Sequence, residues 1–315
     1  MINLQNLNLG EEITDTFLVI NSELKMTVKQ KPYIDMTLSN SSGTINAKLW
    51  DAKKELMDIF YPKFLVKVKA KVDKYNDQFQ LNIDKYKAVT DVFLLSDYIY
   101  GYKRSNEDTF NDILDMVDQT YNDKLKSVVL DILISRKESF IKNGASKEHH
   151  HNYFAGLLEH TYELMKSVEY FCDKYKNLNK NLLICAAAIH DIAKIDEMNS
   201  DEYGFITEYT PSGELLGHLA LGLEEIILTC VKLNIDPKCE EIMLLKHMII
   251  SHHGIPEYGS IKYPMFKEAE LLYYIDVIDC KMNMFDRLSN TLKEGEFSNR
   301  QWSLDNRKIY KFKEI

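Results

Sequence analysis

The chain has 315 residues, of which 45% are hydrophobic and 28% are charged, a balance typical of globular proteins with about two domains. Its formal net charge of −9 excludes a generally basic nucleic-acid-binding surface, so any such binding must be local. No apolar run approaches the roughly 18 residues of a membrane span, and residues 1–13 show no secretory signal. We therefore expect a cytoplasmic protein without a membrane partner.

The first third of the chain alternates apolar and polar residues, which predicts β-strands. Five strands are expected, at residues 16–21, 33–39, 44–49, 64–72 and 78–83. Polar turns at 40–43 and 75–77 join the second strand to the third and the fourth to the fifth. Residues 52–60 have helical spacing. Three strands, a helix and two strands are the order of an OB-fold barrel, which often binds single-stranded nucleic acid.

The same segment resembles the OB-folds of nucleic-acid-binding proteins through Y-I-D-M-T-L at residues 33–38 and G-T-I-N-A-K-L-W-D at 43–51. Its aromatic residues could stack on bases and its lysines could follow a phosphate backbone. The candidates are Phe17, Tyr33, Trp50, Phe79, Lys29, Lys31, Lys48, Lys69 and Lys71. Tyr33 is the first choice because it follows a polar K-Q-K-P turn, with Trp50 and Lys48 beside it. The alternative is that most of these aromatic residues are barrel core.

Residues 85–105 lose the strand pattern, and we interpret them as a connector packed between two domains. Beyond them the pattern is helical almost to the end of the chain. The expected helices span residues 106–119, 123–142, 153–175, 180–192, 212–233, 237–251 and 266–293. The tail at 307–313 has four basic residues and two aromatic ones, which could contact RNA or form a solvated terminal segment.

The five cysteines are odd in number and form no C-x-x-C pair. Most of them lie in apolar helical patterns, at Cys172, Cys185, Cys230, Cys239 and Cys280. This usage is typical of small reduced core residues and argues against a disulfide framework or a zinc ribbon.

The nine histidines all lie between His149 and His253, whereas ordinary core histidines would be scattered. After the triplet at 149–151 they recur in different expected helices or at helix ends: His160, His190, His218, His247, His252 and His253. Carboxylates accompany them in apolar surroundings, Asp191 directly after His190 and Asp276 within residues 271–279. A charge among Ile and Val is costly unless it is paired or metal-bound. The pattern predicts a nitrogen and oxygen metal site shared by several helices, with enough ligands for two ions.

This order of histidines and aspartates resembles the HD-domain superfamily of metal-dependent phosphohydrolases over about residues 148–281. The wording is closest in G-L-L-E-H-T at 156–161, H-D-I-A-K at 190–194, E-Y-T at 208–210, G-E-L-L-G-H at 213–218 and S-H-H-G at 251–254. With an OB-like domain in front, the whole chain is similar to the YhaM-type 3′ to 5′ exoribonucleases of Gram-positive bacteria. The expected organisation is α+β and multidomain. It comprises an OB-fold domain at 1–90, a connector and first helix at 91–122, an all-α HD domain at 123–300 and a basic tail at 301–315.

The resemblance also implies the roles of the site residues. One ion would be held by His160, His190, Asp191 and Asp276, and a second by Asp191, His218 and one or both of His252 and His253. Asp191 would bridge the two ions. Asp279, one helical turn from Asp276, is the alternative last ligand. The histidines His150 and His151 match a family pair and would lie on the substrate side, unless they belong to a plain polar loop.

Lys194 and His247 each allow two interpretations. Lys194 follows Asp191 by about one helical turn and could neutralise charge on a scissile phosphate, so Asp191 and Lys194 are the candidate catalytic residues. The alternative for Lys194 is a surface lysine at a helix end. His247 is about 500° around a helix from His252, which favours a hydrogen-bonded core histidine. Mixed histidine and carboxylate ligation suits Mn, Fe, Co, Ni or Zn, and the resemblance favours Mn²⁺.

Three functions are compatible with these patterns. The first is a metal-dependent 3′ to 5′ exoribonuclease acting on single-stranded RNA, with single-stranded DNA as a second substrate. The second is an HD hydrolase of small nucleotides or cyclic dinucleotides with a regulatory OB-like domain. The third is a nucleic-acid-binding protein with a non-catalytic metal site, which the complete ligand set disfavours. We predict the first; the residues leave oligomeric state open, and a homo-oligomer is compatible with them.

Overall fold

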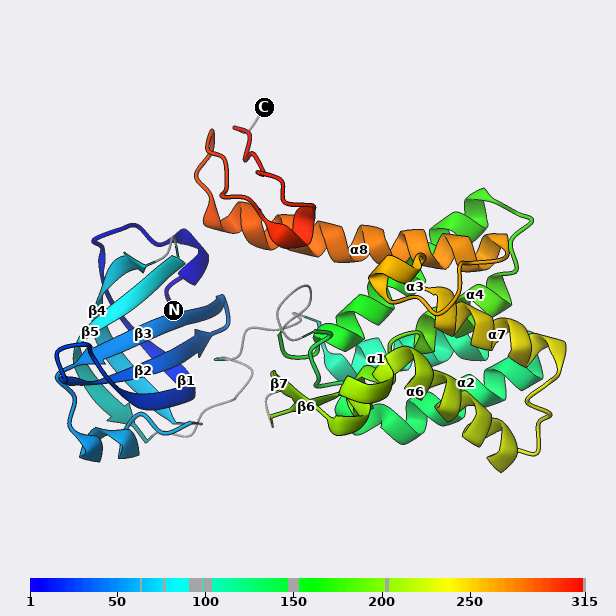
Figure 1. Ribbon diagram of the computed structural model, residues 1–315, viewed down its shortest axis with the longest axis horizontal. Helices are drawn as coiled ribbons and strands as arrows, with labels where there is room; N and C mark the ends of the chain where they lie inside the picture. Colours follow the sequence, from blue (N-terminus) through cyan, green and yellow to red (C-terminus); the bar gives the residue numbers. More distant parts are fainter. Residues whose placement is uncertain are drawn as a thin grey trace. The chain divides into compact units, whose positions relative to one another are not determined.

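The computed structural model describes residues 1–62, 64–75, 78–90, 98, 104–146, 153–201 and 204–313 (Figure 1). The chain divides into two compact units, Met1–Gly101 and Tyr102–Ile315. Most of the predicted connector and the 147–152 segment lie outside the described residues. In the described part of the chain, no helix is long and apolar enough to cross a membrane.

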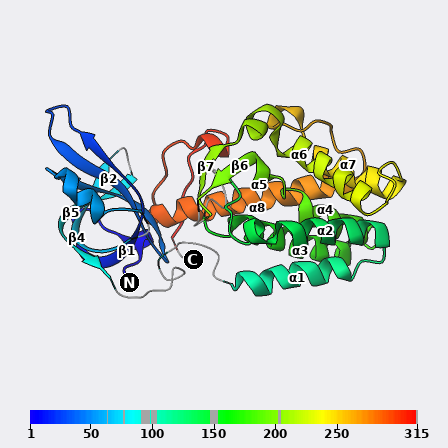
Figure 2. The ribbon, with the colours of Figure 1, turned by 90° about the horizontal axis from the view of Figure 1, so that it is seen from below.

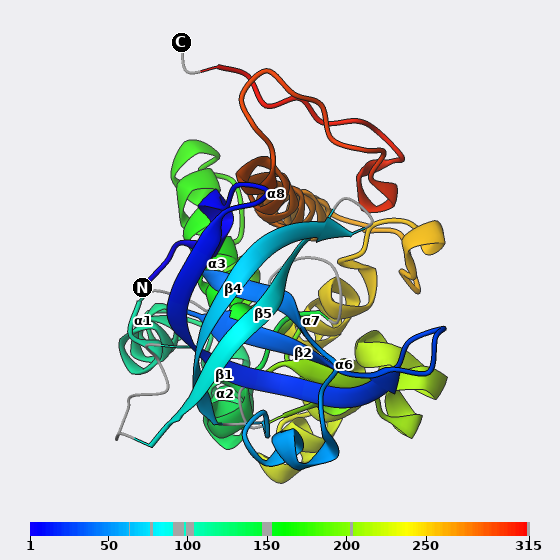
Figure 3. The same cartoon turned by 90° about the vertical axis from the view of Figure 1, so that its left-hand side faces the viewer.

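The first unit is a closed five-stranded barrel with the strand order β1-β2-β3-β5-β4. Its strands are β1 (Glu12–Met26), β2 (Pro32–Asn40), β3 (Gly43–Trp50), β4 (Leu65–Tyr75) and β5 (Gln78–Val89). Neighbours pair antiparallel except β3 and β5, which are parallel where the barrel closes. Figure 3 shows β1, β4 and β5 side by side on the face toward the viewer. This order of strands confirms the predicted OB-fold.

Alternating side chains of the strands fill the barrel. Ile34, Met36 and Leu38 of β2 are buried, as are the inward residues of β4. Phe17 is completely buried in the same core, so the alternative of barrel core holds for it and it is not available to stack on a base. Phe79 is partly buried and packs against this core.

Two local predictions for the barrel need correction. The helix expected at 52–60 is only a short 3₁₀ helix, η2 (Lys54–Asp58), because so short a segment cannot offset the cost of starting an α-helix. The fifth strand continues to Val89, where the sequence predicted the connector, because β5 pairs with β4 along its whole length. A second 3₁₀ turn, η1 (Leu4–Asn6), precedes β1.

The second unit is helical, as predicted. Its longer elements are α1 (Asn106–Asp118), α2 (Asp123–Phe140), α3 (Gly156–Lys174), α4 (Lys180–Ile189), α6 (Pro211–Lys232), α7 (Glu240–Ser251) and α8 (Lys267–Thr291). Shorter elements are α5 (Lys194–Glu197), η4 (Pro256–Tyr258), η5 (Trp302–Leu304) and a hairpin of β6 (Met198–Ser200) and β7 (Ile206–Tyr209). The hairpin and α5 were not predicted. Residues 236–239 form a turn before α7, so that helix begins later than expected.

Helix α4 is the centre of this unit. Every side chain from Leu182 to Ile189 is buried, and the three alanines at 186–188 let other helices approach closely. Figure 2 shows α4 beside α2 and α3, and it also contacts α7 and α8. The helix ends at Ile189, earlier than predicted, so His190 and Asp191 follow its last turn. Because neither residue lies within the helix, the side chains of His190 and Asp191 can point toward the same site.

The C-terminal segment after α8 folds back on itself. Backbone bridges join Phe297 to Tyr310 and Gln301 to Arg307. The backbone N of Ser298 donates to the carbonyl of Ile309 at 2.8 Å. The tail is therefore an ordered extension of the helical unit, with Trp302 exposed on its surface.

Candidate metal centre

The two carboxylate oxygens of Asp191 face two different groups of histidines. Oδ2 lies 3.4 Å from Nε2 of His190 and 3.6 Å from Nε2 of His160. Oδ1 lies 3.5 Å from Nε2 of His218 and 3.5 Å from Nε2 of His252. Asp191 therefore stands between two clusters of ring nitrogens, one at each of its oxygens.

Each cluster has the composition of a metal site. The ligand atoms of His160, His190 and Asp191 all lie within 4.8 Å of one another. The same limit holds for a second group, which consists of Asp191, His218, His252 and His253. Asp276 stands beside the first cluster, with Oδ1 at 3.3 Å from Nε2 of His160. The seven residues predicted as ligands thus come together from α3, α6, α8 and the ends of α4 and α7.

Two histidines are oriented by carboxylates behind them. Nδ1 of His160 donates to Oδ2 of Asp279 at 2.6 Å, and Nδ1 of His218 donates to Oε1 of Glu197 at 2.9 Å. Such a bond holds the tautomer in which Nε2 keeps its lone pair for a metal. Asp279 therefore contacts the rear of His160, whereas Asp276 lies at its Nε2. The sequence marked Asp279 as a competing ligand and missed Glu197 altogether.

Backbone carbonyls orient the other three histidines. Nδ1 of His190 and of His252 each donate at 2.8 Å, to the carbonyls of residues 187 and 249. Nδ1 of His253 donates at 3.0 Å to the carbonyl of Tyr258 in η4. The sequence pattern carries no signal for these bonds, because they depend on how each helix ends.

A break in α6 brings His218 to the centre. Gly217 has φ +70 and ψ 160, inside a segment that is otherwise helical, and this conformation strongly favours glycine. The backbone N of His218 then donates to Oε1 of Glu197 at 3.1 Å, beside the ring bond. At Gly213, a Cβ would lie 2.0 Å from the carbonyl oxygen of Glu197. The two glycines of G-E-L-L-G-H thus let α6 pack onto α5 and turn.

The donor set fits a metal. Among the described residues, Oδ1 of Asp191 and Nε2 of His252 are the buried side-chain atoms without a hydrogen-bond partner. Leaving a buried polar atom unpaired costs about 1–3 kcal/mol. A cation between these two acceptors satisfies both, since each can offer it a lone pair.

The charges at the centre depend strongly on one another: burial opposes the charge of His160, but Asp276 and Asp279 raise the pKa of His160 to about 10. Burial alone would raise the pKa of Asp191, but Lys194 and His190 hold it well below its usual range. Burial also opposes ionisation of Asp276, yet His160 holds the pKa of that carboxyl well below its usual range. Burial lowers the pKa of His253 to about 3, so this ring is neutral, as a metal ligand must be.

Lys194 is a buried residue, and its interpretation as a surface lysine is wrong. Lys194 is the first residue of α5, and its Nζ lies 2.7 Å from Oδ2 of Asp191. Burial opposes its charge, but Asp191 raises the pKa of Lys194 above its usual range. A fixed positive charge therefore stands beside the carboxylate that faces both clusters.

Three of the candidate RNA contacts, Tyr33, Lys48 and Trp50, lie together on the barrel. The rings of Tyr33 and Trp50 are 4.9 Å apart between centroids. Nζ of Lys48 lies 5.8 Å from the Tyr33 ring and 5.6 Å from the Trp50 ring. It also lies 5.0 Å from the ring of Tyr75, which the sequence analysis did not single out. His150 and His151, which were expected on the substrate side of the metal site, lie outside the described residues.

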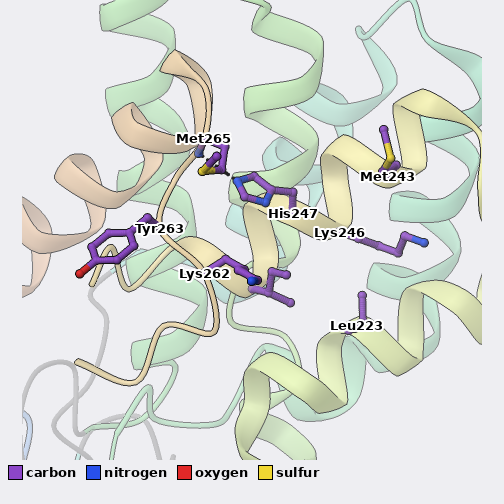
Figure 4. A pocket seen from close by; sticks show the side chains of 8 residues that line it. Leu223, Met243, Lys246, His247, Lys262, Tyr263 and Met265 are labelled. Carbon is purple, nitrogen blue, oxygen red and sulfur yellow. Dashed lines mark hydrogen bonds between the residues drawn. The ribbon is translucent and has the colours of Figure 1, made fainter. Parts of the chain in front are cut away.

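A separate pocket of about 710 Å³ lies between α6, α7 and the segment at 262–265 (Figure 4). Leu223, Met243 and Tyr263 are among its lining residues, and His247 also faces it. Nε2 of His247 accepts a hydrogen bond from the backbone N of Met265 at 3.0 Å. In the described ranges, His247 belongs to none of the groups that could hold a metal. The metal centre is therefore distinct from this pocket.

The comparisons with known proteins agree with this architecture. The family model described as HD domain matches residues 157–281. A 3′-5′ exoribonuclease YhaM of Geobacillus sp. (strain WCH70) is 33% identical over 305 residues, covering 96% of this chain and 92% of that protein. A 3′-5′ exoribonuclease YhaM of Bacillus licheniformis is 32% identical, covering 96% of this chain and 95% of that protein.

Among solved structures, the second OB-fold domain of replication protein A from Methanococcus maripaludis is 14% identical, with a TM-score of 0.24. It covers 30% of this chain and 98% of that one, a likeness too low to add to what the strand order shows. The full-length relatives and the HD match are decisive: this chain, an OB-fold barrel followed by an HD domain, belongs to the family of YhaM 3′-5′ exoribonucleases.

Proposed function

We propose that this protein is a metal-dependent 3′-5′ exoribonuclease that hydrolyses single-stranded RNA, with single-stranded DNA as a second substrate. The observation that carries the proposal is the position of Asp191, whose two oxygens face two groups of histidines. Family membership over nearly the whole chain supports the same activity. It favours the nuclease over a hydrolase of small nucleotides and over a binding protein with a non-catalytic metal site.

We assign ligands to each ion from the donor atoms that lie close together. His160, His190, Asp191 and Asp276 would hold the first ion, and Asp191, His218, His252 and His253 would hold the second. When bound, a pair of divalent ions supplies a nucleophile from water at neutral pH and neutralises charge on the scissile phosphate. Mn²⁺ is the proposed metal, and Fe, Co, Ni and Zn suit the same donors.

The protein's own groups position and balance this centre. Glu197 and Asp279 keep the Nε2 atoms of His218 and His160 directed into it. Lys194 offsets the charge of Asp191 and supplies a fixed positive charge for the scissile phosphate. These groups are arranged before substrate arrives, so little reorganisation is needed during the reaction.

The barrel would hold the RNA strand. Tyr33 and Trp50 offer aromatic rings for stacking, and Lys48 beside both rings carries a charge for the backbone. The Trp50 ring is fixed because its Nε1 donates to Oδ1 of Asn82 at 2.9 Å. A cytoplasmic location, expected from the sequence, suits an RNA substrate.

A direct comparison of substrates tests the proposal. RNA oligomers labelled at the 5′ end, free nucleotides and cyclic dinucleotides are each incubated with the protein and Mn²⁺. We expect the labelled RNA to shorten progressively while the small nucleotides stay intact, and a chelator to stop the reaction. Turnover of only the small nucleotides would favour the second function, and no turnover of any substrate would favour the third.

A further inference from the structure

Cys280 lies at the metal centre and not in the apolar core. It stands one helical turn after Asp276 on α8, and both residues therefore share one face of the helix. Its Sγ donates to Oδ1 of Asp276 at 3.3 Å. The interpretation of the cysteines as core residues thus fails for Cys280, whereas Cys185 and Cys230 are fully buried in the hydrophobic core.

The thiol has the neighbours of a metal ligand. One ring nitrogen of His160, one oxygen of Asp276 and Sγ of Cys280 all lie within 4.8 Å of one another. Among the described residues, no other cysteine belongs to such a group. The oxygen that accepts from the thiol is also the oxygen that lies at Nε2 of His160, on the side of the first ion.

Sulfur changes which metals suit this position. A thiolate is a soft donor that favours Zn²⁺ and related ions, whereas Mn²⁺ prefers oxygen and nitrogen donors. A thiolate from Cys280 would join the nitrogen and oxygen donors already assigned to the first ion, and zinc accepts all three donor types and can expand to five ligands. Binding in this mode releases the thiol proton to solvent.

We propose that Cys280 is an additional, soft ligand of the first ion when the centre holds a thiophilic metal such as Zn²⁺ or Co²⁺. With Mn²⁺ the same thiol stays a hydrogen-bond donor to Asp276. The sulfur thereby raises the affinity of the first position for thiophilic ions relative to Mn²⁺. This inference rests on the metal centre of the proposed function.

Cobalt spectroscopy on the full-length protein reports sulfur ligation directly. Co²⁺ is titrated into the metal-free wild type, Cys280→Ser, Cys280→Ala and Cys239→Ser, and bound cobalt is measured by elemental analysis. Serine keeps a donor toward Asp276 but removes the sulfur, so it separates ligation from a hydrogen bond. Cys239 is a matched control because it is also a half-buried free thiol, at the start of α7.

We expect the wild type and Cys239→Ser to show a near-ultraviolet sulfur-to-cobalt charge-transfer band. Both Cys280 variants should lose this band while they keep visible cobalt bands and bound metal. Zn²⁺ should bind Cys280→Ser at least about 10-fold more weakly than it binds the wild type. Loss of a group that only supports a metal ligand already costs about that much, and loss of a ligand should cost no less. Its affinity for Mn²⁺ should be unchanged.

The opposite outcomes are distinct. Visible cobalt bands without a charge-transfer band in the wild type would overturn the role of Cys280 and leave the metal centre standing. A charge-transfer band that persists in both Cys280 variants would likewise overturn it. Failure of the wild type to bind cobalt at all would overturn the inference together with the proposed metal centre.

Discussion

Glu197 accepts two hydrogen bonds from His218 with the same oxygen, from the backbone N at 3.1 Å and from Nδ1 at 2.9 Å. One carboxylate thus holds both the break in α6 and the orientation of the ring. Burial would raise the pKa of Glu197, but His218 holds it below the usual range, so the group is ionised. Glu197 would therefore act on the proposed second ion through His218.

Replacing Glu197 with Gln tests this relationship. The amide keeps an acceptor of similar shape but removes the charge that strengthens the His218 ring as a donor. We expect the affinity of the second ion to fall about 10- to 100-fold, with the fold intact. Calorimetric titration with Mn²⁺ measures it, and Glu208→Gln on the exposed face of β7 is the control. Equal affinities in the two variants would contradict the role.

Loss of Asp191 should nearly abolish hydrolysis. Asp191→Asn weakens both clusters at once, because each faces one of its oxygens. Lys194→Ala should cost less, on the order of 10²- to 10³-fold in kcat, as when one preorganised charge is removed. Metal content and RNA turnover of the purified variants measure the difference. An Asp191→Asn protein that retains two ions per chain and normal turnover would refute the bridging assignment.

Gly217→Ala should strain the break in α6. A side chain at φ +70 and ψ 160 costs about 1–3 kcal/mol of the free energy of unfolding. Relief of the strain would move His218, so we expect weaker binding of the second ion as well. Gly10→Ala is the control, since Gly10 also has positive φ but lies just before β1 of the barrel, where an added Cβ would meet no atom within 4 Å. It should lower stability without changing metal affinity.

Tyr33→Ala should weaken RNA binding by about 1–3 kcal/mol if the ring stacks on a base. Trp50→Ala should act similarly, whereas Tyr61→Ala, an exposed aromatic outside this cluster, should have little effect. Binding of a labelled RNA to metal-free protein measures this without cleavage. Affinity should also fall as salt rises, because Lys48 acts through counterion release. Unchanged affinity in both Tyr33→Ala and Trp50→Ala would remove the barrel face from the RNA path.

The sequence by itself determined the two architectures and the set of candidate ligands. Alternation in β2 and β4 was readable because only one face of each strand is buried in the barrel. The histidines and aspartates stood out because charged or polar groups in apolar helices need a compensating partner. Local chemistry was enough for the barrel and for the presence of a metal site, whereas the assignment of the seven ligands also used the resemblance to the HD-domain superfamily.

Only the tertiary structure decided how those residues cooperate. Glu197 and Asp279 accept hydrogen bonds from the Nδ1 atoms of His218 and His160, and Cys280 donates one to Asp276. The two histidine bonds form because elements distant in sequence pack around α4. The exposure of Tyr75 beside Lys48 and the burial of Phe17 were decided in the same way. Periodicity records which face of an element is apolar, but the partner of a side chain depends on distances between elements that no local pattern contains.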